Sequence, residues 1–122
     1  MDILKYLDEQ CQLCKQYVFK EKQENEHYDK YAAGVLLNKK RKLDMADKAY
    51  YYFSEHADGV QRTTEPLLYE DSMSKIPFIY NKETYTFMYD AEENTAAFSL
   101  NGKRTKFMSL PALIKVFNNK EF

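Results

Sequence analysis

One stretch of sequence does most to decide the fold: AAFSLNGKRTKFM, residues 96–108. Two short runs with strand-like composition flank Asn101 and Gly102. A two-residue type I′ turn needs a positive φ at both of its positions, and Asn followed by Gly supplies this with the least strain. The stretch therefore predicts a β-hairpin whose strands cover residues 96–100 and 104–108.

Two more strands are predicted immediately upstream, over residues 76–80 and 84–89. Both runs are rich in Tyr, Phe, Ile and Thr, which are enriched in β-strands, and turn residues bound them. Asn81-Lys82-Glu83 and the segment 90–94 supply the two connecting turns. Together the four strands are expected to form an antiparallel meander.

The sequence before Gly59 is instead typical of helices. Residues 2–57 contain no proline and one glycine, Gly34. Apolar residues recur there at three- and four-residue steps, namely Leu7, Cys11, Cys14, Val18, Tyr28, Ala32 and Val35. The stripe turns polar near residues 20–24, so this run is either one long helix or two helices broken there.

A second apolar stripe indicates where the helical half continues: Leu43, Ala46, Tyr50, Phe53 and Ala57. Asp44 is a suitable N-cap for a new helix at this point. Gly59 readily adopts the left-handed conformation that closes a helix. We therefore expect two or three helices over residues 1–58.

A short helix is predicted to close the chain. Ser109 is a suitable N-cap, and Pro111 fits the first turn of a helix that runs to about residue 118. Its apolar face would consist of Leu110, Leu113, Ile114 and Phe117. A chain of 122 residues is long enough for one domain. The expected fold class is α+β, a single domain over residues 1–122 in which the helical half packs on a small antiparallel β half (60–109) with a C-terminal helix (110–118).

Composition narrows the classes of function. The formal net charge is -1, so no whole-molecule field draws the protein to nucleic acid or anionic lipid. No stretch approaches the roughly 18 apolar residues of a membrane-spanning helix, and the first residues lack the pattern of a signal peptide. We therefore expect a cytoplasmic protein with no membrane partner.

Catalytic motifs are not evident. Three glycines in the whole chain leave no phosphate-binding loop, no Gly-x-Ser-x-Gly turn and no dinucleotide fingerprint. The acidic pairs Glu70-Asp71 and Glu92-Glu93 fall in predicted loops, where solvated charge is the ordinary explanation. We expect no catalytic residues and no enzyme activity.

The strongest chemical landmark is a pair of cysteines. Cys11 and Cys14 are the only cysteines of the chain, His27 and His56 are its only histidines, and all four lie in the N-terminal half. Cys-x-x-Cys is a favoured half-site for structural zinc, because a turn or one helical face places both sulfurs on one ion. In the cytoplasm the two thiols are expected to be reduced. We therefore predict zinc as a cofactor, bound by Cys11 and Cys14 together with His27 or His56.

Two arrangements of the helices give the histidines different roles. If residues 2–33 form one straight helix, Cys14 and His27 are about 20 Å apart and cannot share an ion. A hairpin turning at Gly34 would then place His56 opposite the two sulfurs, with an acidic side chain or a second chain completing the ligands. If the helix instead breaks near residue 21, His27 joins the cysteines. The residues alone leave both arrangements open.

Two other interpretations of the cysteines stay open. Free cysteine is often a small core residue on an apolar stripe. The third interpretation is a thiol-redox site, although such sites place Cys-x-x-Cys between a strand and the helix that follows it. No strand is predicted before Cys11.

Two features indicate a binding surface. Lys39, Lys40, Arg41 and Lys42 form the one dense basic cluster, which either contacts phosphates or is a solvated turn between helices. The run YYYF, residues 50–53, occupies successive helical positions, which one narrow face cannot bury together. Unless two layers enclose the helix, Tyr51 and Tyr52 are candidates to face solvent, where tyrosine favours a protein interface.

These features together resemble the small phage-encoded anti-CRISPR proteins that inhibit type II effectors, some of which carry zinc. The likeness lies in small size, composition and the sequence Cys11-Gln12-Leu13-Cys14. It implies a zinc-stapled, stoichiometric inhibitor that blocks a Cas9-type nuclease through a protein surface in the host cytoplasm. The weak net charge argues against DNA mimicry. The alternative is a zinc-scaffolded nucleic-acid-binding regulator that uses residues 39–42.

Overall fold

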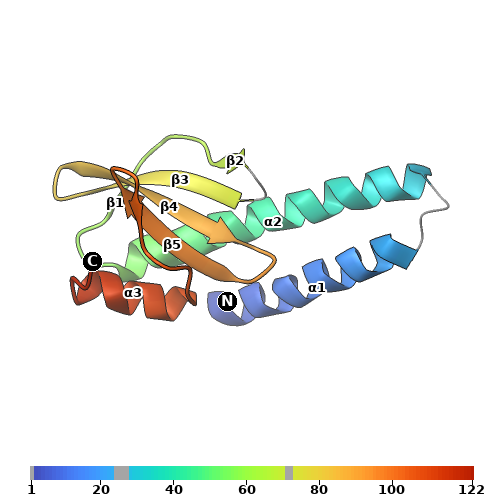
Figure 1. The fold of residues 1–122 in the computed structure, drawn as a ribbon, viewed down its shortest axis with the longest axis horizontal. Helices are drawn as coiled ribbons and strands as arrows, with labels where there is room; N and C mark the ends of the chain where they lie inside the picture. The colour runs from blue at the N-terminus through green and yellow to red at the C-terminus, as the bar shows by residue number, and fades with distance from the viewer. Residues whose placement is uncertain (1, 24–27, 71–72) are drawn as a thin grey trace.

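The computed structural model describes residues 2–23, 28–70 and 73–122, with the backbone alone described over 17–23 and 28–36. Its elements are α1 (Ile3–Gln23), α2 (Tyr28–His56), β1 (Gln61–Arg62), β2 (Leu68–Glu70), β3 (Met73–Tyr80), β4 (Glu83–Asp90), β5 (Thr95–Leu100), β6 (Lys103–Arg104) and α3 (Leu110–Asn118). Two long antiparallel helices precede the antiparallel sheet, and one short helix follows it (Figure 1). The fold is α+β, as the sequence predicted.

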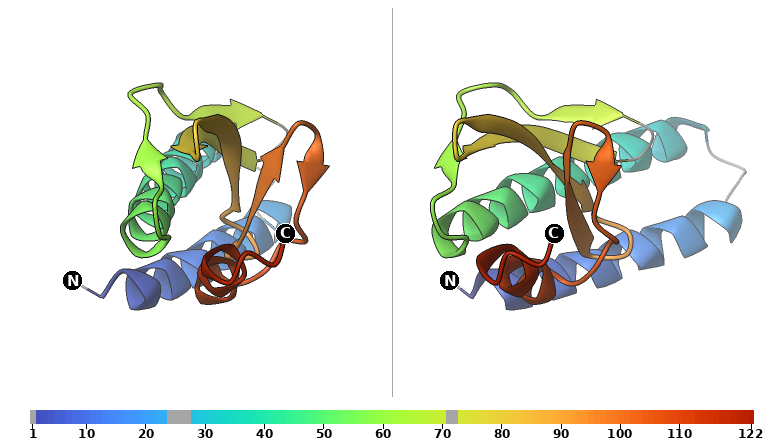
Figure 2. Two further views of the ribbon diagram at one scale, coloured as in Figure 1. Left: turned by 90° about the vertical axis from the view of Figure 1, so that its left-hand side faces the viewer. Right: turned by 60° about the vertical axis from the view of Figure 1, so that its left-hand side comes forward.

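The helices gather on the inner side of a curved sheet (Figure 2). α1 packs along α2, whereas α3 contacts both α2 and β5. The C-terminal part of α1 and the N-terminal part of α2 reach beyond the sheet (Figure 1). Across the residues that the structure describes, none of the helices combines the length and the apolar character needed to cross a membrane.

The sheet has the order β1-β3-β4-β5-β6, and β2 pairs with β3 on the same edge as β1. The strands predicted over 76–80, 84–89 and 96–100 correspond to β3, β4 and β5. β6 is shorter than predicted, because only two of its residues pair as a strand and Met108 makes an isolated bridge to Ala96. The sequence did not predict β1 and β2, since strands of two or three residues show no readable alternation.

Two hairpins turn on pairs of residues with positive φ. The β5–β6 hairpin turns at Asn101 (φ 52°) and Gly102 (φ 82°), which confirms the prediction. β3 and β4 are joined by Asn81 (φ 51°) and Lys82 (φ 66°), a turn one residue shorter than predicted because Glu83 already pairs with Tyr80. A lysine in the left-handed conformation costs roughly 1 kcal/mol relative to glycine.

The helical hairpin corrects several expectations. α1 continues to Gln23 and α2 begins at Tyr28, so the run forms two helices and not one, and Gly34 lies inside α2. α2 continues through Asp44, so the helix start predicted there is wrong. The Asp44 carboxylate accepts hydrogen bonds from the Tyr6 hydroxyl and the Lys48 ammonium instead of capping a helix. The basic cluster at 39–42 is consequently a helical segment, and its interpretation as a turn between helices is also wrong.

α3 follows the sequence closely. The Ser109 side chain accepts a hydrogen bond from the Ala112 amide (N to O, 3.4 Å), which caps the first turn. Leu110, Leu113 and Phe117 are buried, and the fourth expected core residue of this helix is half-buried. The predicted bounds and inner face of this helix are confirmed.

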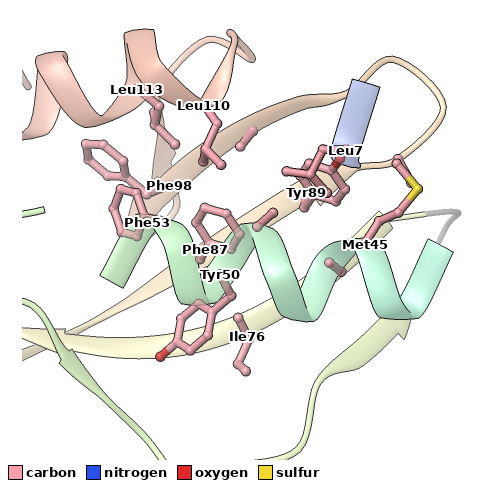
Figure 3. Close-up of a cluster of buried hydrophobic side chains, with 14 of the residues drawn as sticks. Leu7, Met45, Tyr50, Phe53, Ile76, Phe87, Tyr89, Phe98, Leu110 and Leu113 are labelled. Carbon is pink, nitrogen blue, oxygen red and sulfur yellow. The ribbon is translucent and has the colours of Figure 1, made fainter. Parts of the chain in front are cut away.

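Phe53 of α2 lies at the centre of the hydrophobic core. Its fully buried ring is 5.0 Å from Phe87, 5.3 Å from Phe78 and 5.6 Å from Phe117, measured between centroids. Figure 3 shows Phe53 and Phe87 between α2 and the sheet, with Leu113 of α3 nearby. Aromatic pairs of this kind add about 0.5–1.5 kcal/mol each beyond the area they bury. The cluster joins α2, the sheet and α3 in one core.

Candidate functional site

Cys11 and Cys14 lie on the buried side of α1. The Cys11 thiol donates a hydrogen bond to the carbonyl oxygen of Glu92 (Sγ to O, 3.2 Å), and the Cys14 sulfur is 3.9 Å from the Met45 sulfur. Burial raises the pKa of both thiols, so both are protonated at neutral pH. Their environment is that of core cysteines and lacks the lowered pKa of a reactive thiol.

The structure does not bring His56 to the cysteines. The imidazole Nδ1 of His56 is 2.9 Å from the carbonyl oxygen of Tyr52, and its ring stacks on the Tyr52 ring at 4.0 Å. His56 is eleven residues along α2 from Met45, the neighbour of Cys14, which corresponds to about 16 Å of helix. The hairpin turn at Gly34 that would have placed His56 opposite the sulfurs is therefore wrong, because Gly34 lies inside α2, which begins at Tyr28.

The other predicted ligand, His27, lies outside the described residues. Within the described ranges, no three Cys, His, Asp or Glu side chains come together as a metal site. These ranges offer a zinc ion two thiols, whereas a structural site requires four ligands. Zinc therefore stays a prediction, and it needs His27, another undescribed group or a second chain to complete the site.

Polar side-chain contacts join the turn between β4 and β5 to both α1 and α2. The Lys42 Nζ is 2.7 Å from the Glu92 Oε1, and the Asn94 amide donates to the Asp8 carboxylate at 2.7 Å. The Tyr89 hydroxyl donates to Asn94 at 2.6 Å. Burial lowers the pKa of Lys42, but the hydrogen bond and charge of Glu92 outweigh it, so the net shift is upward. The carboxylate of Glu92 therefore compensates the charge of Lys42, and the ion pair joins α2 to the turn between β4 and β5.

The basic cluster does not form one surface. Lys39 is exposed, with its ammonium 5.6 Å above the Tyr69 ring, and Lys40 is also exposed. Arg41 is half-buried and donates to the Asn38 side chain at 3.1 Å, while Lys42 is buried. Because successive helical residues point about 100° apart, the four charges encircle α2. Two of the four, Lys39 and Lys40, are exposed.

The tyrosine run divides between core and solvent, which confirms that one helix face does not bury it all. Tyr50 is buried and its hydroxyl donates to the Pro77 carbonyl at 3.0 Å, and Phe53 is fully buried. Tyr52 is half-buried and packs against the core cluster. Tyr51 is 48% exposed.

Tyr51 belongs to a small ordered surface group. The Arg62 guanidinium of β1 lies 5.0 Å from the centre of the Tyr51 ring. The same guanidinium pairs with the Glu55 carboxylate at 3.1 Å. Glu55 follows Tyr51 by one turn of α2, so the two side chains lie on the same face. We call Tyr51, Glu55 and Arg62 the Tyr51 patch.

No match was found among known protein families, curated proteins or solved structures. The function is therefore inferred from the chain's own residues.

The sequence analysis did not identify two members of the Tyr51 patch, Glu55 and Arg62. Glu55 carries a readable signal, because it lies four residues after Tyr51 on the same helix. Arg62 carries none, because it belongs to a strand of two residues that the sequence does not reveal. Its position over Tyr51 depends on how β1 pairs with β3 beside α2.

Proposed function

We propose that this protein is a small, non-enzymatic inhibitor that binds a partner protein through the Tyr51 patch. The observation that carries the proposal is the 48% exposure of Tyr51 together with the Arg62 guanidinium 5.0 Å from the centre of its ring. Tyr and Arg are the residue types most enriched among interface residues that dominate binding energy. The ion pair between Arg62 and Glu55 favours this ordered arrangement before a partner arrives.

Preordering matters because binding loses less entropy when the contacting side chains are already restrained. An immobilised side chain costs roughly 0.5–1.5 kcal/mol on association. Arg62 is held by two contacts, one to the Tyr51 ring and one to Glu55, while both partners stay accessible to a second protein. A planar ring beside a guanidinium suits a partner surface that presents an apolar pocket with a neighbouring carbonyl or carboxylate.

The partner proposed for the first test is a Cas9-type nuclease in the cytoplasm of a phage-infected host. This choice comes from the resemblance to anti-CRISPR proteins, which rests on size, composition and the Cys11 to Cys14 motif. In the same proposal, Cys11 and Cys14 hold a zinc ion with His27 and a further group. Zinc would supply a structural cross-link, which stabilises only the folded chain.

The test titrates purified protein into a guide-loaded Cas9-type nuclease and measures cleavage of a target duplex. A stoichiometric blocker completes inhibition near one equivalent when the nuclease concentration is well above the dissociation constant. Tyr51→Ala is expected to weaken binding by about thirtyfold, equivalent to about 2 kcal/mol. Tyr51→Phe keeps the ring and is expected to stay within about threefold of the wild type.

Tyr69→Ala provides the matched control, since it removes a tyrosine that lies outside the Tyr51 patch. Equal weakening by Tyr51→Ala and Tyr69→Ala would remove the patch from the proposal. Lack of binding to Cas9-type nucleases would instead remove the named partner. Turnover, seen as complete inhibition far below one equivalent, would contradict a stoichiometric mechanism.

A further inference from the structure

A second surface, independent of the Tyr51 patch, has the form of a binding groove. A cavity of about 640 Å³ opens between the β5–β6 hairpin and the end of α3. Its floor is apolar and includes Phe98, Leu100, Met108 and Val116. Figure 2 shows that the end of the chain after α3 lies between α3 and this hairpin. This volume falls within the range of about 300–1,000 Å³ that is usual for ligand sites.

Phe122 forms one wall of the groove. Its ring lies 4.9 Å from the Phe98 ring and stacks on the Phe117 ring at 5.5 Å, yet the residue is 52% exposed. A large apolar side chain that is ordered by aromatic neighbours and still half exposed keeps apolar surface in contact with water. Covering that surface with a ligand is favourable by roughly 25 cal/mol per Å².

The rim of the groove is basic. Lys103, Arg104 and Lys106 are all exposed, and Glu121 is the one acidic residue of the lining. Within the described part of the chain, no carboxylate lies within ion-pair distance of these three basic side chains. The Arg104 guanidinium lies 4.8 Å from the Phe107 ring, a contact that restrains it at the rim. Three uncompensated cations beside an apolar floor are complementary to a ligand that is both acidic and apolar.

The hairpin edge indicates how such a ligand is held. β6 is the last strand of the sheet and has two residues, Lys103 and Arg104. Short, charged edge strands disfavour the addition of another strand through backbone hydrogen bonds. Recognition at this edge therefore falls to side chains, with the cations binding carboxylates and the floor receiving an apolar group.

We propose that this groove binds an acidic peptide segment of a partner protein, with one aromatic or aliphatic side chain seated on the floor between Phe98 and Val116. A segment of a larger protein is favoured over a small amphiphile because most of the charged lining faces solvent. A small ligand usually buries about 70–90% of its surface, which an open groove of this kind does not provide. A peptide needs only its anchor buried while its carboxylates meet the exposed rim.

The test uses a random peptide library displayed on phage and selected against the full chain. Enriched sequences are expected to combine Asp or Glu with a Phe, Leu, Ile or Trp. A synthetic copy of an enriched peptide is then measured by fluorescence anisotropy, and its site is located by amide chemical-shift changes. Those changes should centre on β5, β6 and α3.

Two groove variants and one control sharpen the measurement. The double variant Lys103→Glu with Lys106→Glu is expected to weaken peptide binding at least about tenfold, because it replaces attraction by repulsion at the rim. Val116→Glu should weaken binding similarly by placing a charge on the floor, and Val116 lies outside the core cluster, which limits the cost to folding. Lys39→Glu with Lys40→Glu makes the same change of charge on α2 and should stay within about twofold.

Selection of basic or uncharged peptides, or of none, would overturn the proposal. So would chemical-shift changes away from the groove, or equal losses in the rim variant and the α2 control. Preferential binding of oleate or of a single-stranded oligonucleotide at the groove would also overturn it, because the occupant would then be a lipid or a nucleic acid. Thermal melting of each variant separates lost binding from lost folding.

Discussion

The ammonium of Lys42 lies 2.7 Å from the carboxylate of Glu92, and this ion pair joins the middle of α2 to the turn between β4 and β5. The Lys42 side chain is 11% exposed, whereas that of Glu92 is 46% exposed. The pair is therefore asymmetric. Loss of Glu92 would leave a desolvated charge without compensation, while loss of Lys42 would leave a carboxylate that water still solvates.

We expect Glu92→Gln to lower the free energy of unfolding by about 1–3 kcal/mol, because it leaves the buried ammonium without its counter-charge. Lys42→Met keeps the aliphatic part of the side chain and should cost less. Urea unfolding of both variants beside the wild type gives the comparison. A larger loss for Lys42→Met than for Glu92→Gln would contradict this explanation.

The hydrogen bond between Tyr6 and Asp44 predicts a dependence of stability on alkaline pH. This hydrogen bond, followed by burial, raises the pKa of Tyr6 from 10.0 to about 12. A raised folded-state pKa gives stability that is fully present below pH 10 and is lost as the pH rises toward 12. The difference in unfolding free energy between wild type and Tyr6→Phe should therefore shrink across this window.

The same hydrogen bond acts in the opposite direction on the acid side. The Tyr6 hydroxyl is the main cause that lowers the pKa of Asp44 below its ordinary value of 3.8. The stability gained from Asp44 is present above pH 3.8 and is lost as the pH falls through the folded-state pKa. Tyr51→Phe is the control for both windows, because the Tyr51 hydroxyl makes no hydrogen bond within the described residues. A difference between wild type and Tyr6→Phe that does not vary with pH would contradict both expectations.

Lys82 holds a positive φ of 66° in the turn between β3 and β4, where glycine is favoured. We expect Lys82→Gly to raise the free energy of unfolding by about 0.5–1 kcal/mol by relieving that strain. The reverse experiment is Gly102→Ala in the β5–β6 turn, where a methyl group meets no atom within 4 Å and the backbone strain alone should destabilise. Thermal melting of both variants checks the pair, and a lower melting temperature for Lys82→Gly would contradict this explanation.

The zinc prediction is tested by metal content. If zinc is bound, mass spectrometry of protein purified without chelators or nickel resin should give about one equivalent. His27→Ala should reduce that content, whereas His56→Ala should not, because His56 stacks on Tyr52 away from the cysteines. Cys11→Ser and Cys14→Ser should abolish the metal and sharply lower the melting temperature. A zinc content of the wild-type protein below about a tenth of an equivalent would contradict the prediction.

Salt dependence separates the two partner classes. A nucleic-acid complex that used several phosphate contacts would lose roughly 10³-fold or more in affinity between 50 and 200 mM salt. The exposed members of the basic cluster, Lys39 and Lys40, supply fewer contacts than this, so duplex binding is expected to be weak. Affinity for a protein partner at the Tyr51 patch should change little with salt. Tight, steeply salt-dependent duplex binding lost in Lys39→Ala with Lys40→Ala would favour the nucleic-acid alternative.

The sequence predicted most of the regular structure and little of the candidate sites. Local signals were sufficient for β3, β4, β5, the Asn101 turn and α3, since strand composition, turn preference and helix capping depend on neighbouring residues. The helix start at Asp44 was predicted wrongly because its carboxylate accepts a hydrogen bond from Tyr6, a contact between distant residues that no local pattern reveals. Likewise, Lys42 belongs to a basic run in the sequence but to a buried ion pair in the fold.

By itself, the sequence determined most of the helices and strands and showed that one helix face does not bury Tyr50 to Phe53 together, because helical period and backbone preference act over a few residues. Only the tertiary structure decided which distant side chains meet. α1 packs along α2 with Cys14 beside Met45, which leaves His56 at the far end of α2. Strand pairing sets Arg62 beside Tyr51, and the packing of α3 against β5 leaves the groove next to Val116, since both depend on contacts between separate elements of the fold.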